Sequence, residues 1–236
     1  MVDFHSHILP GIDDGAKDIE TSVKMLELSK SQGVHTIIAT PHYYANKATI
    51  DEFLKAREDS YNSLMAYVTD KGIEIPKILL GAEVAFSAEC TAIDMSGLCI
   101  ENTNAILIEL PYTFLNGWIY KEIYNISMKH SLDVILAHAE RYIGKRNDFS
   151  MVDPFLDLDM YIQINADSFI DRRFRKAVKK FFEKGKVDLI GSDAHNLTTR
   201  VSRIDKAYRL INKSYGEKEL KRIRENSIKI LGEQVV

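Results

Sequence analysis

Cysteines and long apolar runs are scarce in this chain, and their scarcity excludes several kinds of protein. Only Cys90 and Cys99 occur among 236 residues, which fits neither a disulfide framework nor a cysteine-rich zinc site. No apolar run approaches the roughly 20 residues that a membrane-spanning helix needs. Asp3 and His5 interrupt the apolar stretch that a secretory signal would require. We therefore expect a soluble, cytoplasmic protein without membrane insertion.

The chain also lacks the charge excess and the glycine-rich loops that are typical of nucleic-acid and nucleotide binding. Its formal net charge of -3 gives no electrostatic reason to expect a nucleic-acid partner. Neither the Gly-x-Gly-x-x-Gly pattern nor the Walker pattern occurs, so nucleotide binding by those loops is not expected. A hydrophobic content of 45% and a charged content of 28% are ordinary for a globular protein. At this length we expect residues 1–236 to form a single domain.

Apolar runs that read as strands alternate with helical patterns along the whole chain. The first run ends in His5-Ser6-His7, and six more cover 34–40, 77–83, 104–109, 133–138, 160–165 and 187–193. Such continuous apolar runs are typical of buried parallel strands. Helical spacing of apolar residues is found at 18–33, 53–72, 118–130, 168–184, 200–213 and 217–231. Seven strand–helix units without a phosphate-binding loop favour an α/β fold of the TIM-like barrel type over an open, doubly wound sheet.

Polar side chains stand at the carboxyl end of nearly every predicted strand. In a barrel these ends meet at one rim, where the active sites of such folds lie. His5 and His7 share a face of their strand, because alternate side chains point the same way. Asp193 and His195 repeat this spacing at the last strand, which neighbours the first strand in a closed barrel. The candidate metal ligands are His5, His7, Asp14, His42, Glu83, Glu109, His138, Asp193 and His195.

A structural interpretation competes with a metal for each of these residues taken singly. One histidine near a strand end is more often a hydrogen-bonded core or surface residue than a ligand. Buried imidazoles and carboxylates are costly, however, unless they are paired or bound to a metal. That seven strands each end in such a residue by accident is implausible, so the set as a whole predicts a metal site.

The ligand types and their number indicate the chemistry. Imidazole and carboxylate without thiolate suit manganese, iron, zinc or cobalt. Nine candidates exceed what one ion takes, so we expect two or three ions that share carboxylates. Clusters of this kind generate hydroxide at neutral pH and stabilise in-line displacement at phosphorus. Arg141 and Arg200 then have a role as phosphate-binding forks, and the competing interpretation for each is a surface arginine.

The motifs resemble, in order along essentially the whole chain, those of the PHP (polymerase and histidinol phosphatase) superfamily. More closely, the chain resembles its bacterial manganese-dependent protein-tyrosine phosphatases from capsule and exopolysaccharide loci. The matching motifs are His5-Ser6-His7, Asp13-Asp14-Gly15, Thr40-Pro41-His42, Gly81-Ala82-Glu83, Ile108-Glu109, Ala137-His138-Ala139-Glu140-Arg141 and Gly191-Ser192-Asp193-Ala194-His195-Asn196.

The resemblance implies a distorted seven-stranded barrel that holds three metal ions, preferably manganese. By residue, the first ion would take His5, His7, Glu83 and Asp193, the second Glu83, Glu109 and His138, and the third Asp14, His42 and His195. Within the Asp13-Asp14 pair, Asp14 is the expected ligand. Arg141 and Arg200 match the phosphate-binding, catalytic arginines of the family.

The resemblance also implies a substrate and a partner. The expected activity is hydrolysis of phosphotyrosine by metal-activated hydroxide, on a tyrosine kinase whose tyrosine-rich tail controls capsular polysaccharide synthesis. Neither Cys90 nor Cys99 is followed by arginine six positions later, so the loop of cysteine-nucleophile phosphatases is absent. Two alternatives stay open: a phosphatase for a small metabolite such as histidinol phosphate, and a metal-stabilised scaffold that binds the kinase without turnover.

Two further features each have two interpretations. The basic run 172–186 is either the solvated face of a helix with Phe174, Val178 and Phe181 turned inward, or a surface that steers an acidic or membrane-attached partner. Aromatic residues near the rim either cover the top of the barrel or wall a pocket for a phenyl ring. These aromatic residues are Tyr43, Tyr44, Tyr112, Phe114 and Trp118.

Overall fold

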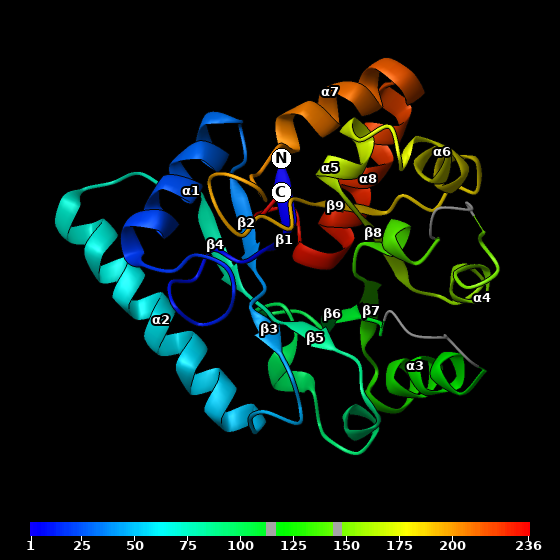
Figure 1. Ribbon diagram of the computed structural model, residues 1–236, viewed down its shortest axis with the longest axis horizontal. Coiled ribbons are helices and arrows are strands. Elements are labelled where there is room, and N and C mark those ends of the chain that lie inside the picture. Colours follow the sequence, from blue (N-terminus) through cyan, green and yellow to red (C-terminus); the bar gives the residue numbers. More distant parts are fainter. Residues whose placement is uncertain (112–116, 144–147) are drawn as a thin grey trace.

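The structure, a computed structural model, describes residues 1–111, 117–143 and 148–236, in which strands and helices alternate (Figure 1). The strands are β1 (Val2–Ser6), β2 (Thr36–Ala39), β3 (His42–Tyr43), β4 (Lys77–Leu80), β5 (Glu83–Ala85), β6 (Ala105–Glu109), β7 (Asp133–Leu136), β8 (Tyr161–Asn165) and β9 (Leu189–Gly191). The α-helices are α1 (Ile19–Ser31), α2 (Ile50–Lys71), α3 (Gly117–His130), α4 (Asp153–Leu156), α5 (Ala166–Ile170), α6 (Arg175–Glu183), α7 (Ile204–Tyr215) and α8 (Glu217–Leu231). The 3₁₀ helices are η1 (Ala88–Thr91), η2 (Ser96–Leu98) and η3 (Ala139–Ile143).

The described residues form nine strands where seven were expected, because two of the predicted runs are interrupted. The run 34–40 gives β2 and continues as β3 after Pro41, and the run 77–83 divides into β4 and β5 at Gly81. Proline has no N–H to donate to a ladder, which accounts for the first interruption. The Gly81 N–H still donates to the carbonyl oxygen of Ala39 at 2.9 Å, so the two runs stay paired across the break.

All strand pairings are parallel, and the sheet curls so that its first and last strands lie side by side. The orders β1-β2-β4 and β3-β5-β6-β7-β8-β9 follow the sequence around the sheet. Ser6 forms a parallel bridge with Ala194, just beyond β9. Two backbone bonds extend this seam: Asp193 N–H to His5 O at 2.7 Å and His7 N–H to Ala194 O at 2.9 Å. The expected α/β class and the neighbouring first and last strands are confirmed.

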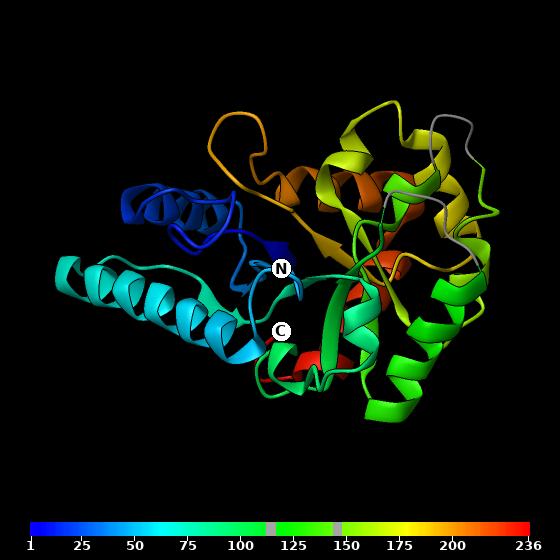
Figure 2. The ribbon, with the colours of Figure 1, turned by 60° about the horizontal axis from the view of Figure 1, so that its bottom comes forward.

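Local capping explains where the two long N-terminal helices begin and end. The Asp18 carboxylate accepts the Thr21 N–H at the start of α1. At α2, Thr49 and Glu52 form a capping box, and Gly72 ends the helix in the left-handed conformation at φ 61°. The two helices lie against each other on one flank of the sheet (Figures 1 and 2).

The prediction of one helix over 168–184 was wrong, because the chain turns between α5 and α6. Asp171 adopts an extended backbone, with φ -75° and ψ 119°, and its carboxylate accepts the Arg173 N–H at 2.9 Å. A side chain that satisfies nearby backbone N–H groups in this way competes with continuation of a helix. The next predicted helix also begins later than expected, at Ile204 instead of Arg200. Arg200 therefore belongs to the loop after β9.

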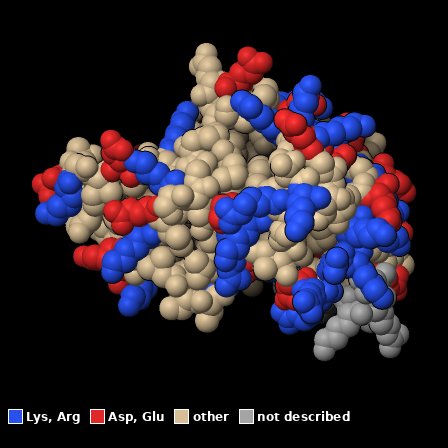
Figure 3. All heavy atoms as spheres, turned by 90° about the horizontal axis from the view of Figure 1, so that it is seen from above, with Lys and Arg blue, Asp and Glu red and all other residues tan. Residues whose placement is uncertain are grey.

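The basic run 172–186 forms a solvent-facing surface around α6. Ala177, Val178 and Phe181 are buried, and Phe174 is half-buried against the core. Figure 3 shows lysine and arginine side chains spread over the face that is seen from above, interspersed with aspartate and glutamate. The interpretation as a solvated helix face is confirmed for these residues, and steering of an acidic partner stays a prediction.

Gly15 allows the loop after β1 to fold back on His7, so we expect Gly15→Ala to destabilise the protein. An added Cβ would lie 2.2 Å from the His7 carbonyl oxygen and 2.5 Å from the His7 Cβ. Such crowding by backbone typically costs about 1–3 kcal/mol in the free energy of unfolding, measurable with urea. Gly117→Ala is the control, because no described atom lies within 4 Å of its added Cβ. Equal stability of the two variants would contradict this account of the loop.

Candidate metal centre

The structure brings all nine predicted ligands together at the carboxyl ends of the strands. β1 carries His5, β3 and β5 begin with His42 and Glu83, β6 ends with Glu109, and the remaining ligands, His7 among them, follow β1, β7 and β9. His138 and Asp193 have left-handed backbones, with φ of 35° and 52°. Such conformations are costly for residues other than glycine and cluster at functional sites. The predicted convergence of these side chains is therefore found in the structure.

The Glu83 carboxylate lies at the middle of the cluster, surrounded by four imidazoles. Its Oε2 atom is 3.1 Å from His5 Nε2, 3.2 Å from His7 Nε2 and 3.0 Å from His42 Nδ1. Its Oε1 atom is 2.8 Å from His138 Nε2. The side chain is only 1% exposed, so burial alone would raise the pKa of Glu83. The surrounding histidines reverse that effect and hold this pKa well below its usual range.

A second set of side chains meets on the outer side of the cluster. Ligand atoms of His7, Asp14, His42 and His195 all lie within 4.8 Å of one another. Asp14 Oδ1 is 3.5 Å from His42 Nε2 and 3.4 Å from His195 Nε2. This set contains the three residues expected for the third ion and adds His7.

The other groupings share members instead of dividing cleanly into separate sites. Three further sets of ligand atoms lie within 4.8 Å of one another: His5 with His7 and Asp193, His5 with Glu83 and His138, and His42 with Glu83 and Glu109. Glu109 also lies 3.4 Å from His138 Nε2. Such overlap is what side chains that bridge neighbouring ions require.

Buried atoms without hydrogen-bond partners show that the cluster fits metal ions. Glu83 Oε2, His42 Nδ1 and His195 Nε2 are inaccessible to solvent and make no hydrogen bond. Buried polar atoms are paired in the great majority of cases. All three atoms carry lone pairs and face the other ligands, which is the arrangement that a divalent cation satisfies.

Two hydrogen bonds at the other ring nitrogens orient imidazoles toward the cluster. Asp13 Oδ2 lies 2.7 Å from His7 Nδ1 and also accepts the His42 N–H at 3.0 Å. His195 Nδ1 lies 3.0 Å from the carbonyl oxygen of Asp193. Because these oxygens only accept, both Nδ1 atoms carry hydrogen, and a metal-binding lone pair remains at each Nε2 once that atom is deprotonated. These contacts make Asp13 a support for the imidazoles, and the assignment of Asp14 as the ligand stays a prediction.

The mutual pairing of charges shifts the pKa values of several ligands. Burial lowers the pKa of His7, but the carboxylates of Asp13 and Glu83 outweigh burial and raise it to about 10. For His138 burial acts the same way, and Glu109 and Glu83 raise the pKa to about 9. Burial and the neighbouring cation of His7 lower the pKa of His195 to about 4. Without metal, protons on the imidazoles supply much of the positive charge that the carboxylates need.

Arg141 and Arg200 lie between the buried cluster and solvent. Arg141 Nη2 donates to Asp193 Oδ2, and Arg200 Nη2 donates to Asp193 Oδ1 at 2.6 Å. Arg200 Nη1 is also 3.8 Å from Asp14 Oδ2. The arginine side chains are 29% and 37% exposed, whereas Asp193 is 2% exposed. They therefore lie on the partly exposed side of the ligands, here called the opening, from which an anion would approach.

Three buried polar side chains beside the cluster were missed in the sequence. Gln163 Oε1 lies 3.2 Å from His5 Nδ1, and the Asp3 carboxylate accepts the His5 N–H at 3.2 Å. Glu140, next to Arg141, is 1% exposed and accepts the Ser168 hydroxyl at 2.7 Å. A polar residue within an apolar run is a signal in the sequence, because such a residue needs a hydrogen-bond partner when it is buried. The sequence alone does not identify these partners, because they lie on other elements of the fold.

The rim aromatics differ in their placement. Tyr43 is 2% exposed and packs against Phe53, so it cannot wall a substrate pocket. Tyr44 lies beside His42, with ring centroids 5.4 Å apart, and carboxylates of the cluster raise its pKa together with burial. Trp118 is 45% exposed and lies near Phe86. The predicted positions Tyr112 and Phe114 lie outside the described residues.

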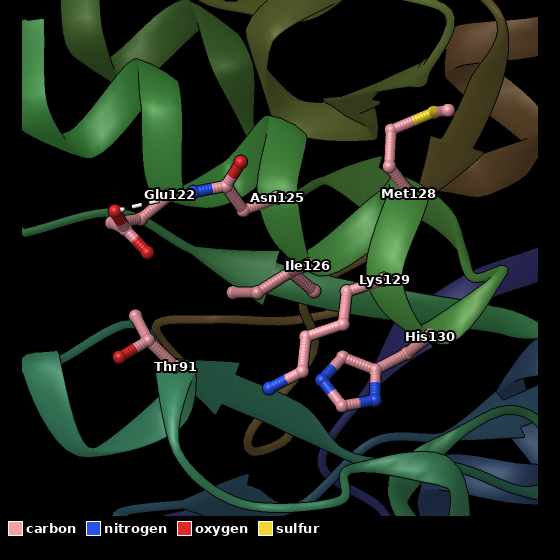
Figure 4. Close-up of a pocket in the computed structure, with 7 residues that line it drawn as sticks. All are labelled: Thr91, Glu122, Asn125, Ile126, Met128, Lys129 and His130. Atoms are coloured by element: carbon pink, nitrogen blue, oxygen red, sulfur yellow. Dashed lines mark hydrogen bonds between the residues drawn. The ribbon is translucent and has the colours of Figure 1, made fainter.

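A separate cavity of about 460 Å³ lies beside α3 and contains none of the candidate ligands. Figure 4 shows Lys129 and His130 extending from α3 toward the segment that carries Thr91. Its one carboxylate, Glu122, accepts a hydrogen bond from Asn125 at 3.3 Å. Within the described residues, every set of three or more closely spaced imidazoles, carboxylates or thiolates lies in the central cluster.

Comparison with known proteins identifies the family. The family model described as capsular polysaccharide synthesis, CpsB/CapC, matches residues 1–232. The chain belongs to this family. Tyrosine-protein phosphatase CpsB of Streptococcus pneumoniae is 30% identical over 251 residues, with 100% of both chains covered. Tyrosine-protein phosphatase YwqE of Bacillus subtilis (strain 168) is 29% identical over 243 residues, covering 100% of this chain and 93% of YwqE.

Solved structures show the same fold as this member of the CpsB/CapC family. The crystal structures of YwqE and CpsB, described as unique metal-dependent tyrosine phosphatases, include a chain that matches with a TM-score of 0.86 at 24% identity. That match covers 100% of this chain and 96% of the other. The phosphotriesterase homology protein of Escherichia coli matches with a TM-score of 0.55 at 12% identity, covering 97% of each chain. In the described part of the chain, no helix combines the length and apolar character needed to cross a bilayer.

We expect divalent metal ions to displace protons when they bind to the metal-free protein. His7 and His138, with pKa values of about 10 and 9, are protonated at pH 7, and a bound metal needs their lone pairs. Metal affinity should therefore fall as the pH is lowered. Calorimetric titration in buffers with different heats of ionisation measures the protons released. His35→Ala, outside the cluster, is the control and should release the same number. Uptake of metal without proton release would refute the charge balance described here.

Proposed function

We propose that this chain is a metal-dependent protein-tyrosine phosphatase. One observation carries the proposal: nine ligand side chains converge in a buried cluster, and two arginines stand at its opening. Membership of the CpsB/CapC family and the names of the relatives from Streptococcus pneumoniae and Bacillus subtilis support the same activity. A scaffold without turnover would need neither the complete ligand set nor the arginines.

The proposed cofactor is manganese, in three ions held by the ligand sets expected from the sequence. His5, His7, Glu83 and Asp193 would hold the first ion, Glu83, Glu109 and His138 the second, and Asp14, His42 and His195 the third. The short distances from Glu83 to four imidazoles support its position as a bridging ligand. We take the curled sheet to be a distorted seven-stranded barrel of the PHP type, with β2 and β3 counted as one interrupted strand and β4 and β5 as another. In this proposal residues 1–236 form one domain.

The protein's own groups bind and orient the phosphate ester. When bound, the ions would activate water and neutralise charge on the phosphate oxygens. The Arg141 and Arg200 guanidinium groups match phosphate oxygens in pairs, and their partial exposure lets them reach an incoming ester. Asp193 holds both guanidinium groups in place through its two carboxylate oxygens. Preorganised charges of this kind act chiefly on the transition state.

The proposed substrate is a phosphotyrosine protein, and within that class a tyrosine kinase of capsular polysaccharide synthesis. The family description supports the link to capsule synthesis. Hydrolysis of phosphotyrosine peptides, compared with histidinol phosphate in the presence of manganese, tests the substrate class. Faster turnover of histidinol phosphate would replace the proposal with the small-metabolite alternative. Absence of turnover on both, with metal bound, would favour the scaffold.

The cysteines should be dispensable for catalysis, while the metal should be essential. Cys90 and Cys99 are buried, and burial raises the pKa of Cys99 to about 11, which leaves its thiol protonated at neutral pH. We expect the Cys90→Ser/Cys99→Ser variant to keep most of its phosphotyrosine hydrolysis and EDTA to remove it. Inactivation by thiol alkylation, with EDTA harmless, would indicate covalent catalysis instead.

Lysine at position 141 or 200 should impair catalysis without loss of metal. Arg141→Lys and Arg200→Lys keep the charge and lose the bidentate fork. We expect kcat/KM to fall by roughly 10- to 1,000-fold, in line with loss of one preorganised donor. The effect of Arg141 should appear in kcat, and that of Arg200, which lies on a longer loop, in KM. Arg209→Lys is the control, because Arg209 pairs with Asp205 on α7. Normal kinetics in both variants would make these residues surface arginines.

A further inference from the structure

Strand β8 supplies no ligand, yet two of its side chains lie directly against the metal cluster. Gln163 and Asn165 are two residues apart on the strand, so they share a face. Both are buried, with exposures of 0% and 5%. An amide in such a position needs partners for all of its polar atoms, because burial without hydrogen bonds is costly. The hydrogen-bond partners of these two amides connect them to the ligands.

Hydrogen bonds join the two amides into a chain that ends on Asp193. The backbone N–H of His138 donates to Gln163 Oε1 at 2.8 Å. Gln163 Nε2 donates to Asn165 Oδ1 at 2.9 Å, and Asn165 Nδ2 donates to Asp193 Oδ2 at 2.8 Å. A backbone N–H can only donate, so it fixes which end of the Gln163 amide faces it. That orientation in turn fixes the Asn165 amide, which must present its NH₂ group to Asp193.

The same chain determines which nitrogen of His5 carries hydrogen. Gln163 Oε1 lies 3.2 Å from His5 Nδ1, and an amide oxygen can only accept. Nδ1 is therefore the N–H, which leaves the lone pair of neutral His5 on Nε2. That atom faces Glu83 Oε2 at 3.1 Å and Asp193 Oδ1 at 3.6 Å, inside the cluster.

We propose that Gln163 and Asn165 are positioning residues of the metal centre. Gln163 selects the His5 tautomer that presents Nε2 to a metal ion, and Asn165 aims the Asp193 carboxylate. The inference rests on the proposed metal site. It adds two residues from β8, which lies between β7 and β9 and contributes no ligand itself. Outer hydrogen bonds of this kind typically change metal affinity or activity by 10- to 100-fold.

The surroundings hold both amides in place. A Cβ on Gly191 would lie 2.8 Å from Gln163 Nε2 and 2.5 Å from the His5 Cβ, so glycine at this point of β9 makes room for the amide. On the other side, Glu140 Oε2 accepts the backbone N–H of Asn165 at 3.4 Å, which restrains the main chain that carries this amide. Asp193 itself has a left-handed backbone, with φ of 52°, so its direction depends on partners such as Asn165.

A purely structural role predicts a different outcome, and the chain offers a matched control. Asn226 on α8 is also buried, at 7% exposed, and its Nδ2 donates to Asp188 Oδ1 at 3.2 Å. Asn226 has no contact with the cluster. Asn226→Leu therefore removes a buried Asn–Asp bond of the same type without touching a ligand.

The test is metal titration of metal-free protein carrying Asn165→Leu, Gln163→Met or Asn226→Leu. Gln163→Met keeps the approximate size of the side chain and adds no charge, but it removes both the acceptor that faces His5 and the donor to Asn165. Mn²⁺ affinity follows from electron paramagnetic resonance, ligand geometry from the visible spectrum with Co²⁺, and folding from thermal unfolding without metal. We expect roughly 10- to 100-fold weaker Mn²⁺ binding and an altered Co²⁺ spectrum for the two β8 variants. Asn226→Leu should unfold at a lower temperature but keep the Mn²⁺ affinity and the Co²⁺ spectrum of the wild type.

The outcomes separate this inference from the proposed function. Unchanged Mn²⁺ affinity and Co²⁺ spectrum in the folded β8 variants would overturn the positioning role and leave the phosphatase intact. If the β8 variants bind Mn²⁺ more weakly and the wild type hydrolyses no phosphotyrosine, the positioning role is supported and the phosphatase is overturned. Equal loss of affinity in Asn226→Leu would show that general destabilisation, and not positioning, is being measured. Wild-type protein that takes up no metal would overturn both.

Discussion

Burial of the Glu83 carboxylate among four histidines is the constraint on which the rest of this structure depends. An unpaired charge at 1% exposure would be untenable, and here each carboxylate oxygen lies within about 3 Å of imidazole nitrogens. These nitrogens come from β1, β3 and the end of β7, so no single element can supply them. The curled sheet brings its strand ends together and so surrounds this carboxylate with imidazoles from several strands. The charge balance around Glu83 therefore depends on the curled architecture of the sheet.

The same balance explains why protons and metal ions compete for the cluster. Carboxylates raise the pKa of His7 and of His138 against the effect of burial, so positive charge is held at the centre even without metal. Divalent ions supply that charge more compactly and release the imidazole lone pairs for coordination. Buried atoms that make no hydrogen bond, such as Glu83 Oε2, then acquire partners. Arg141 and Arg200 extend the positive charge outward to the opening, where an anionic ester arrives.

The convergence of the candidate ligands was predictable from the sequence, whereas the residues that support them were not. Polar residues at the ends of apolar runs can be recognised in the sequence, and parallel strands bring such ends together whatever their exact register. Gln163 and Glu140 matter because of the residues opposite them, and those depend on the pairing of β7, β8 and β9. The helix expected over 168–184 failed for a related reason: Asp171 binds local N–H groups, which periodicity does not record. The sequence likewise does not determine which ligands share an ion, because the sets of neighbouring ligand atoms overlap.

Closure of the sheet and construction of the site coincide at the seam between β1 and β9. The buried Asp3 carboxylate accepts the Ser192 N–H at 2.7 Å and the His5 N–H at 3.2 Å, which ties the two strands together directly below the ligands. Above it, Asp193 N–H donates to His5 O. Each bond that closes the sheet thus lies within two residues of a ligand. A seam held this way fixes His5 and His7 opposite Asp193 and His195, because the register of one backbone pairing sets the positions of all four side chains.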